Sequence, residues 1–311
     1  MEAQKTTTKK YKKYKPWQNV LTVIFAILSF VWILPIIAVV LNAFKSQVYI
    51  FNNPFGISTE SIFKIGIKEW AKNLPLATQS RSSGEAMFLI NMKNAIEQTD
   101  FWHAFLYSVF ITIVSVALIL LCCSMCAYFI TRVHTKFTKL FYLLCLFSMI
   151  VPFQMVMFTL SKFANMLHLY TPWGITIVYL GFGAGLSVFM YTGFIKSMPI
   201  DIEEAAMIDG CTPLQTYFQV VFPIMKPTTI TIAILQSMWI WNDYLLPSLV
   251  LDVNDYKTIP IAIQYLTTSH GNINWGAMMA ALLLAIIPIV IFYLAAQKYI
   301  IEGVMAGAVK G

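Results

Sequence analysis

Charged residues are scarce in this sequence. They make up 11% of its 311 residues, whereas 59% are hydrophobic and the mean hydropathy is +0.71. Soluble domains carry charge on about a quarter of their residues, so the composition excludes an ordinary soluble protein. It indicates a chain built for lipid.

Cysteine and histidine are also few. The five cysteines lie in or beside apolar runs, which predicts no disulfide framework, and the four histidines lack metal-ligand spacing. Cys122, Cys123 and Cys126 are spaced like a metal cluster, but they lie mid-span with no histidine or acid nearby. We interpret them as helix-packing residues and expect no bound metal.

Nucleotide-binding motifs are missing as well. The sequence has no Gly-x-x-x-x-Gly-Lys-Ser/Thr stretch, so the chain is not expected to hydrolyse ATP or to bind a cofactor itself. "GFGAG" at Gly181–Gly185 is similar to a dinucleotide turn, but it lies within an apolar run without a flanking strand. We interpret it as small residues that let helices approach closely.

Long apolar runs are what the sequence has in abundance. Since about 20 apolar residues cross a bilayer, six spans are predicted. They are Trp17–Ala43, Ala104–Ile130, Leu140–Leu160, Gly174–Ile195, Thr228–Leu251 and Gly276–Tyr299.

The basic residues predict the orientation. The 1–16 leader has six lysines against one acid, and the apolar run after it is too long for a signal peptide, so we expect a retained anchor. With the N-terminus inside, the cytoplasmic segments hold 13 of the 21 basic residues, and both termini are cytoplasmic. A nucleic-acid role for the leader is the disfavoured alternative. The 44–103 segment is then an extracytoplasmic loop, either a plain connector or a docking surface.

A capped helical hairpin interrupts the apolar spans within 197–227. In "MPIDIEEAAMIDG", Asp201 and Glu204 predict a capping box, acids fill the first turn, and Gly210 predicts a left-handed stop. In "CTPLQTYFQVVFP", Thr212 and Gln215 predict a second capping box, with a proline at the first helical position. Pro223 and a second proline at 227 are expected to end that helix. The apolar face is formed by Leu214, Phe218, Val221 and Phe222.

An apolar face rimmed by polar groups is typical of a partner site rather than of a plain connector. The segment resembles the EAA loop of binding-protein-dependent ABC importer permeases. That pattern has Glu-Ala-Ala, three residues, Gly, nine residues, then an aliphatic residue, a spacer, an apolar residue and Pro. The matching residues are Glu204, Ala205, Ala206, Gly210, Val220, Phe222 and Pro223, with Glu203 before them and Asp209 before the glycine.

Two further stretches resemble the maltose-type carbohydrate subfamily. "WNDYLLPSL" at Trp241–Leu249 resembles the signature of its fifth span, and the C-terminal residues resemble the tail of one of its two permease subunits. In that tail Gly303, Gly307, Ala308, Val309, Lys310 and Gly311 occupy the pattern positions.

The resemblance implies a type I ABC importer permease fold, with an all-α core at 104–299 and a cytoplasmic tail at 300–311. It implies that the chain pairs with a second permease subunit in the bacterial plasma membrane. Two cytoplasmic ATPase subunits would bind ATP and Mg, and an external solute-binding protein would deliver sugar. The hairpin residues, with Gly307 and Lys310 of the tail, would contact the ATPase.

Polar residues within spans are candidates for lining the substrate path. Gln236 lies two helical turns before Asp243, the acid well inside a predicted span, and Gln154 follows Pro152, where a kink is expected. The alternative is that these side chains hold helices together or mark the end of a span. The candidates are Gln154, Gln236, Trp241, Asn242, Asp243 and Tyr244.

Three other functions compete with sugar import. An ABC permease for an anionic solute, such as a glycerol-phosphate ester, would need basic residues in the path, and the predicted spans have none in their middles. An ion-coupled secondary transporter would need inverted repeats and would leave the hairpin unexplained. A membrane scaffold would need no path.

Overall fold

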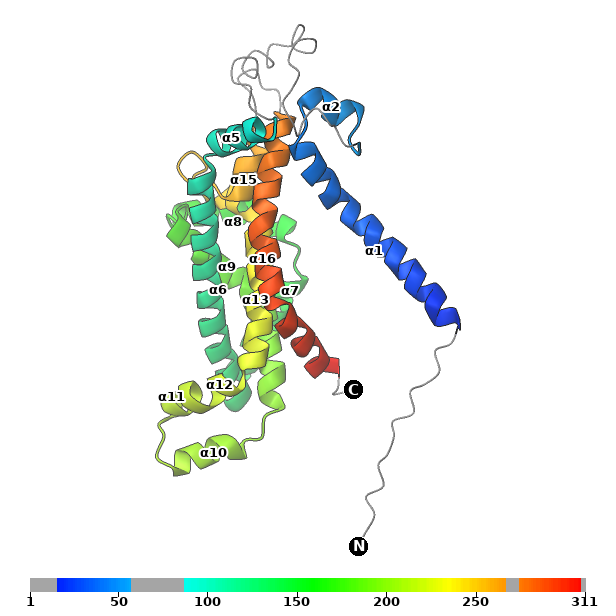
Figure 1. Ribbon diagram of the computed structural model, residues 1–311. Coiled ribbons are helices and arrows are strands. Elements are labelled where there is room, and N and C mark those ends of the chain that lie inside the picture. The colour runs from blue at the N-terminus through cyan, green and yellow to red at the C-terminus, as the bar shows by residue number, and fades with distance from the viewer. Residues whose placement is uncertain (1–15, 57–86, 267–273, 309–311) are drawn as a thin grey trace.

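The computed structural model describes residues 16–56, 87–266 and 274–308, and this part of the chain contains helices and no strand. Figure 1 shows a bundle of long helices, a short helical hairpin that projects from one end, and α1 leaning away from the bundle. The long helices are α1 (Pro16–Ala43), α6 (Phe101–Arg132), α7 (Lys136–Ile150), α8 (Phe153–Met166), α9 (Pro172–Lys196), α13 (Lys226–Asn242) and α16 (Trp275–Ala308). The short ones are α2 (Gln47–Asn52), α5 (Met87–Thr99), α10 (Asp201–Ile208), α11 (Pro213–Gln215), the π-helix η2 (Thr216–Val221), α12 (Phe222–Ile224), α14 (Leu245–Val250) and α15 (Ile259–Gln264).

Four of the described helices, α1, α6, α9 and α16, are long and apolar enough to cross a membrane. Two bent pairs raise that number to as many as six. One pair joins α7 to α8 at 109°, and the other joins the segment Pro213–Ile224 to α13 at 74°. The six predicted spans are therefore the upper limit.

The third predicted span, Leu140–Leu160, is broken at the proline where a kink is expected. The chain turns sharply between α7 and α8, and Val151 is extended there, with φ −72° and ψ 117°. Pro152 explains the break, because proline lacks an N–H and disfavours helical backbone at the residue before it.

The fifth and sixth spans also differ from the prediction. Thr228–Leu251 is divided into α13 and α14, because Asp243 is extended at the end of α13. The helix α16 continues through the predicted tail as far as Ala308, so the described part of that tail is helical. The last three residues, and residues 57–86 of the loop expected at 44–103, lie outside the described residues.

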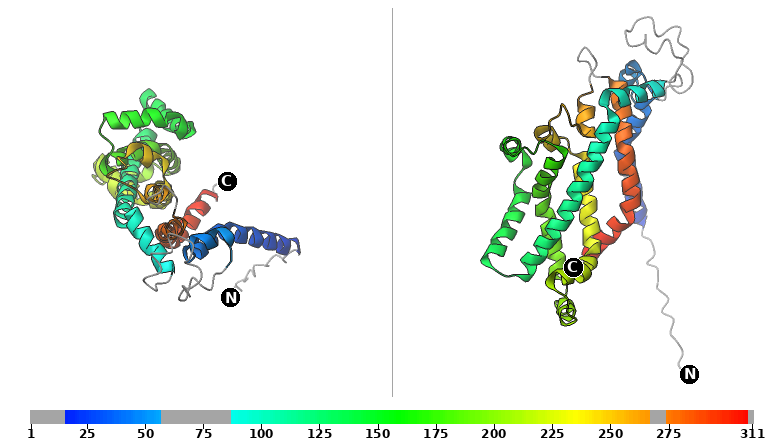
Figure 2. Two further views of the ribbon diagram at one scale, coloured as in Figure 1. Left: turned by 90° about the horizontal axis from the view of Figure 1, so that it is seen from above. Right: turned by 90° about the vertical axis from the view of Figure 1, so that its left-hand side faces the viewer.

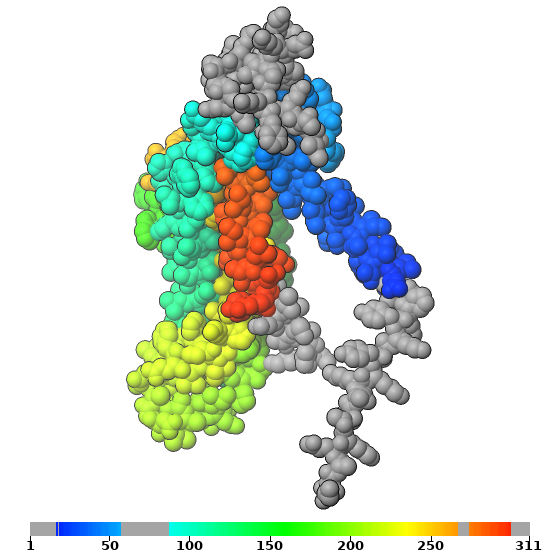
Figure 3. All heavy atoms as spheres, in the orientation of Figure 1, coloured from blue at the N-terminus to red at the C-terminus, as the bar shows by residue number. Residues whose placement is uncertain are grey.

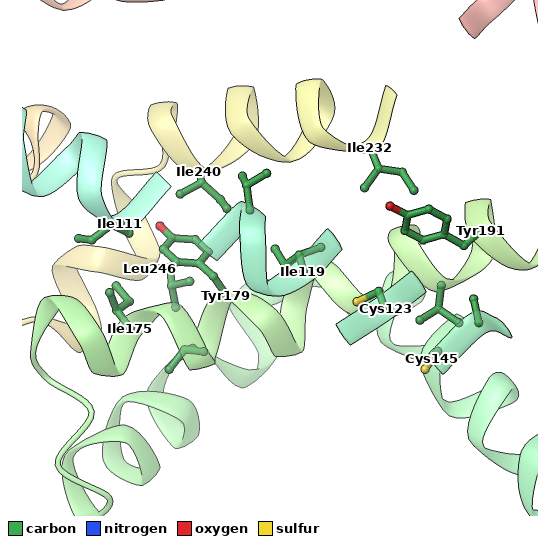
Figure 4. Close-up of a cluster of buried hydrophobic side chains, with 14 of the residues drawn as sticks. Ile111, Ile119, Cys123, Cys145, Ile175, Tyr179, Tyr191, Ile232, Ile240 and Leu246 are labelled. Carbon is green, nitrogen blue, oxygen red and sulfur yellow. The ribbon is translucent and has the colours of Figure 1, made fainter. Parts of the chain in front are cut away.

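The core is centred on α6 and α9, which pack along each other, with α7 and α13 beside them. Figure 4 shows Ile119 of α6, Tyr179 of α9 and Ile240 of α13 meeting in this cluster. All three are nearly or fully buried. Because α6 and α9 share the most extensive contact, they form the rigid centre of the subunit.

Two glycines of α9 allow this close packing. A Cβ at Gly183 would lie 2.5 Å from Ile119 Cδ1, and one at Gly185 would lie 2.9 Å from the carbonyl oxygen of Cys145 on α7. A Cβ at Gly181 would meet nothing within 4 Å. The interpretation of "GFGAG" as a packing motif is confirmed at Gly183 and Gly185.

Gly185→Ala is expected to destabilise the chain, because the new methyl group would press on a backbone carbonyl that cannot rotate away. Overpacking of this kind costs about 1–3 kcal/mol. Gly181→Ala is the matched control and should be neutral or slightly stabilising, since alanine favours a helix over glycine. Thermal unfolding of the detergent-solubilised chain checks both, and equal stability of the two variants would contradict the packing role of Gly185.

A polar cluster fixes the end of the bundle opposite the hairpin. Lys45 is 2% exposed, and its Nζ donates to Asn42 Oδ1 at 3.0 Å and to the carbonyl oxygens of Asn53 at 2.8 Å and Pro54 at 3.0 Å. Burial lowers the pKa of the Lys45 amine. The amide of Asn91 on α5 donates to the carbonyl oxygen of Lys45 at 2.9 Å. These bonds hold α2 and α5 at the point where α1 leaves the bundle. The view from above in Figure 2 shows α1 extending away from the other long helices.

Candidate functional site: the capped hairpin between α9 and α13

The hairpin runs from α10 through α11, η2 and α12 to α13, and Figure 3 shows it as a knob beyond the long helices. The sharp turn between its two arms is set by Gly210, whose φ is +91°. Gly210 N donates to Met207 O at 3.1 Å, and Cys211 N donates to Ala206 O at 3.0 Å. This pair of bonds is a Schellman motif, which needs a left-handed residue at the position that Gly210 occupies. The predicted glycine stop is confirmed.

The predicted capping box at Asp201 is wrong. The N-cap is Ile200, which has helical backbone with φ −67° and ψ −28°, and no side-chain cap is formed. Asp201 is instead the first helical residue. The clustering of acids in the first turn is still found, with Asp201, Glu203 and Glu204 near the positive end of the helix dipole.

The second arm begins as predicted but continues differently. Thr212 and Gln215 form the predicted capping box, with Thr212 N donating to Gln215 Oε1 at 2.8 Å and Gln215 N donating to Thr212 Oγ1 at 3.4 Å. After one α-helical turn the backbone widens into the π-helix η2, which buries Tyr217 and Val221. Pro223 lies at the start of α12 rather than ending the arm. The arm ends at Ile224, before the 74° bend into α13.

The hairpin presents a mixed surface of apolar and acidic side chains. Ile208 is 86% exposed and Leu214 is 63% exposed, and Met207 and Phe218 are exposed beside them. Glu204 and Ala205 are exposed on α10, and Asp209, Gly210 and Pro223 are exposed as well. Large apolar side chains rimmed by carboxylates form a surface suited to a protein partner that carries basic residues.

Glu203 differs from its neighbour Glu204 because it points into the protein. It is 3% exposed, and its Oε1 accepts from Arg132 Nε at 2.9 Å while its Oε2 accepts from Tyr128 OH at 2.9 Å. Ala206 is buried as well. Of the two predicted glutamates, only Glu204 is therefore available to a partner.

The contacts of Tyr128 and Arg132 with Glu203, and of Tyr217 with Ser124, are not predicted from the sequence. Arg132 lies 71 residues before Glu203, so no local pattern connects the two. The signal that could have suggested them is the spacing of Ser124, Tyr128 and Arg132, which recur every four residues and so share one helix face.

The candidate path residues lie in several places. Gln236 Nε2 donates to Gly183 O at 3.3 Å and to Ser187 Oγ at 3.2 Å, so Gln236 joins α13 to α9. Asp243 accepts from Tyr179 OH at 3.1 Å and from Leu245 N at 3.0 Å. Both candidates are thus engaged within this chain.

The other four path candidates are not gathered at one point. Asn242 donates to Met238 O at 2.7 Å on its own helix. Gln154 is exposed on α8, beyond the bend, and Tyr244 is exposed. Trp241 lines a cavity of about 220 Å³ between α6, α13 and α16, and its neighbours there include Thr112 and Ser237. The cavity lining is mostly apolar with a few hydroxyl groups, a combination typical of small-molecule sites.

The tail prediction is only partly within the described residues. Gly307 lies in the last turns of α16, and Lys310 lies outside the described residues. Figure 1 shows the last turns of α16 toward the end of the bundle that carries the hairpin.

A bundle of apolar helices, several of them long enough to cross a membrane, with an exposed hairpin between two of them is typical of a multi-pass membrane protein. Residues 120–305 match the family model described as the binding-protein-dependent transport system inner membrane component, and the chain belongs to this family. It is a multi-pass transport subunit of the inner membrane and not an enzyme, and such permeases carry no cofactor of their own.

Similar proteins are named as permeases of the same kind of transport system. The chain is 36% identical over 299 residues to a protein of Thermoanaerobacterium thermosulfurigenes named probable starch degradation products transport system permease protein, with 96% of this chain and 99% of that one covered. It is 35% identical over 227 residues to the melibiose/raffinose/stachyose import permease protein of Bacillus subtilis, covering 71% and 80%.

The fold also matches a solved structure. A chain in the crystal structure of a bacterial ABC transporter involved in the import of the acidic polysaccharide alginate superposes with a TM-score of 0.68. The match covers 93% of this chain and 99% of that one at 19% identity. At that identity the match establishes the ABC importer permease fold.

Proposed function

We propose that this chain is one of two different permease subunits of an ATP-driven importer for a neutral sugar or oligosaccharide. The observation that carries the proposal is the hairpin, whose turn is fixed by Gly210 and whose surface combines exposed apolar residues with Glu204. A rigid hairpin whose surface combines apolar side chains with the carboxylate of Glu204 is complementary to a cleft lined by apolar and basic residues. The partner ATPase subunits supply such a cleft and bind ATP and Mg.

The orientation places the hairpin in the cytoplasm. Arg132, Lys196 and Lys226 support this, because they lie at the ends of α6, α9 and α13 nearest the hairpin, and basic residues are enriched in cytoplasmic segments. Both termini are then cytoplasmic, and the tail that contains Gly307 and Lys310 adds a second contact with the ATPase. The Lys45 end faces the external solute-binding protein.

The coupling step is mechanical. When ATP closes the two ATPase subunits, each docked hairpin is drawn toward the centre of the complex. The capped arms transmit this displacement as a unit, since the Schellman turn and the Thr212 capping box fix the backbone of each arm. The permease pair then changes from inward-facing to outward-facing and accepts sugar from the binding protein.

The choice of sugar as substrate is supported by the relatives named above and by the cavity. Trp241 lines the cavity, which suits sugar because aromatic rings stack on the apolar faces of pyranoses, and Thr112 and Ser237 are the polar residues of the lining. Gln236 and Asp243 act in this proposal by holding α13 and α9 around the path. A glycerol-phosphate ester is the second candidate, and it would require basic side chains that the middles of the spans lack.

Reconstitution tests the proposed function. The chain, the second permease, the ATPase and the binding protein encoded beside it are placed in vesicles, and uptake of labelled oligosaccharide is measured. We expect uptake that requires ATP and the sugar-loaded binding protein and that persists when ionophores collapse the ion gradients. Uptake driven by an ion gradient without the ATPase would overturn the proposal. A thermal-shift screen of the binding protein identifies which sugar to use.

A further inference from the structure

Three polar side chains form a stripe along one face of α6, close to the hairpin. They are Ser124, Tyr128 and Arg132, spaced four residues apart, and together they contact Glu203 and Tyr217. Arg132 binds Glu203 Oε1 through Nε at 2.9 Å and also through a second guanidinium nitrogen. The stripe therefore ends in two charge-assisted hydrogen bonds to one carboxylate oxygen, Glu203 Oε1, while Tyr128 OH donates to the other, Oε2.

The stripe holds both arms of the hairpin. Glu203 belongs to α10, and Tyr217 belongs to η2 in the other arm. Ser124 Oγ and Tyr217 OH lie 2.6 Å apart, and the rings of Tyr128 and Tyr217 have their centroids 5.3 Å apart. One face of α6 thus contacts both arms of the hairpin. It binds α10 through the ion pair with Glu203, and it binds η2 through the hydrogen bond and ring contact with Tyr217.

The ion pair between Arg132 and Glu203 is largely buried, and burying the Glu203 carboxylate would be unfavourable if either of its oxygens lacked a hydrogen-bond donor. The Glu203 side chain is 4% exposed and that of Arg132 is 20% exposed. A buried carboxylate is strongly unfavourable unless it is paired and hydrogen-bonded, and both oxygens of Glu203 have partners. Such a pair adds little stability compared with apolar packing, but it allows only one arrangement of the groups.

The π-helix supports the same geometry. A π-turn inserts an extra residue into the helix and is frequent at functional sites. Here it turns Tyr217 and Val221 inward, and Tyr217 is 2% exposed. The side chain that meets Ser124 on α6 comes from this irregular segment, so the local distortion and the joint with α6 occur together.

We propose that the residues Ser124, Tyr128, Arg132, Glu203 and Tyr217 form a rigid joint that transfers the displacement of the docked hairpin into α6. This inference rests on the proposed function and adds the route by which force enters the bundle. Apart from the joint, the hairpin is held by its two backbone connections, to α9 and to α13, and by Val221 and Phe222, which pack against the hydrophobic core. With it, the hairpin acts directly on the α6–α9 centre of the subunit. Arg132, Tyr128 and Glu203 are positioning residues in this role.

The test separates coupling from assembly. In the reconstituted importer, Glu203→Gln and Arg132→Met are each expected to lower the sugar imported per ATP hydrolysed by about tenfold, within the usual range of coupling energies. The ATPase should still co-purify in normal amount, because Glu204 and the exposed apolar face are unchanged. Lys136→Met, an exposed cation at the same end, is the matched control and should couple normally.

Two further variants make the test independent of folding defects. Arg132→Glu combined with Glu203→Arg restores opposite charges and is expected to regain most of the coupling lost in the single variants. Tyr128→Phe removes one oxygen atom and keeps the ring packing, and we expect it to lower the coupling ratio about fivefold, at the weak end of coupling energies. A normal ratio for Tyr128→Phe would overturn the joint.

A distance measurement supplies a readout that stability alone does not move. Spin labels at Phe129 on α6 and Asp201 on α10, both exposed, report on the joint in the assembled complex. We expect a narrow distance distribution in the parent protein and a broadened one in Glu203→Gln and Tyr128→Phe. An unchanged width with normal coupling would refute the joint while leaving the docking proposal intact. Failure of the parent complex to require its ATPase would instead refute the proposed function.

Discussion

Gly210→Pro is expected to reduce sugar uptake to background while the chain still inserts and pairs in the membrane. Proline fixes φ near −65°, whereas Gly210 has φ +91°, and proline also removes the N–H that donates to Met207 O. The turn between the arms would reopen at a cost of about 3 kcal/mol or more, and the surface built from α10 and α11 would be lost. Uptake by reconstituted vesicles and membrane fractionation measure the two effects.

Gly210→Asn is the control for this variant. Asparagine tolerates the left-handed region better than other non-glycine residues, and an added Cβ at this position meets nothing within 4 Å. We expect uptake close to that of the parent protein. Full activity of Gly210→Pro would show that the shape of the turn is irrelevant to transport.

Glu204→Lys should prevent the ATPase from binding, with uptake lost in proportion. Glu204 is exposed on α10 and is the acid of the hairpin's Glu-Ala-Ala stretch, so a lysine there would face the basic residue proposed in the cleft. Placing like charges together at an interface costs several kcal/mol, and a penalty of only about 2 kcal/mol weakens binding roughly 30-fold. Binding of purified ATPase to nanodiscs that contain the permease pair measures this directly.

Glu97→Lys is the matched control for the charge reversal. Glu97 is also exposed, but it lies on α5 at the opposite end of the bundle. The same change of net charge at that position should leave ATPase binding intact. If both variants bind the ATPase normally, Glu204 is not part of the docking surface.

The structural features of the hairpin and the spans differ in how well the sequence predicts them. The turn at Gly210 and the cap at Thr212 were predictable because they depend on backbone geometry over four or five adjacent residues. The Asp201 cap failed because the preceding residue, Ile200, is already helical, and this depends on how the chain arrives from α9. The break at Pro152 was expected as a kink, but its angle depends on what α8 packs against beyond it.

Glu203 shows the limit most clearly. In the sequence it is one of two adjacent glutamates with nothing to distinguish them. Successive residues on a helix point about 100° apart, so when α10 packs against the rest of the chain, one glutamate turns inward and the other outward. Which of them turns inward is decided by Arg132 and Tyr128, whose positions relative to α10 exist only after α6 and the hairpin have packed.

The sequence by itself determined that this chain lies in a membrane, where its apolar helices run, and that a capped hairpin interrupts them, because hydropathy, capping and glycine geometry are local properties of the chain. Only the tertiary structure decided which polar side chains hold the subunit together and which remain for a partner. Hydrogen bonds such as those of Arg132 with Glu203 and of Gln236 with Ser187 join residues far apart in the sequence. Their energies depend on burial and relative orientation, which arise when the helices come together.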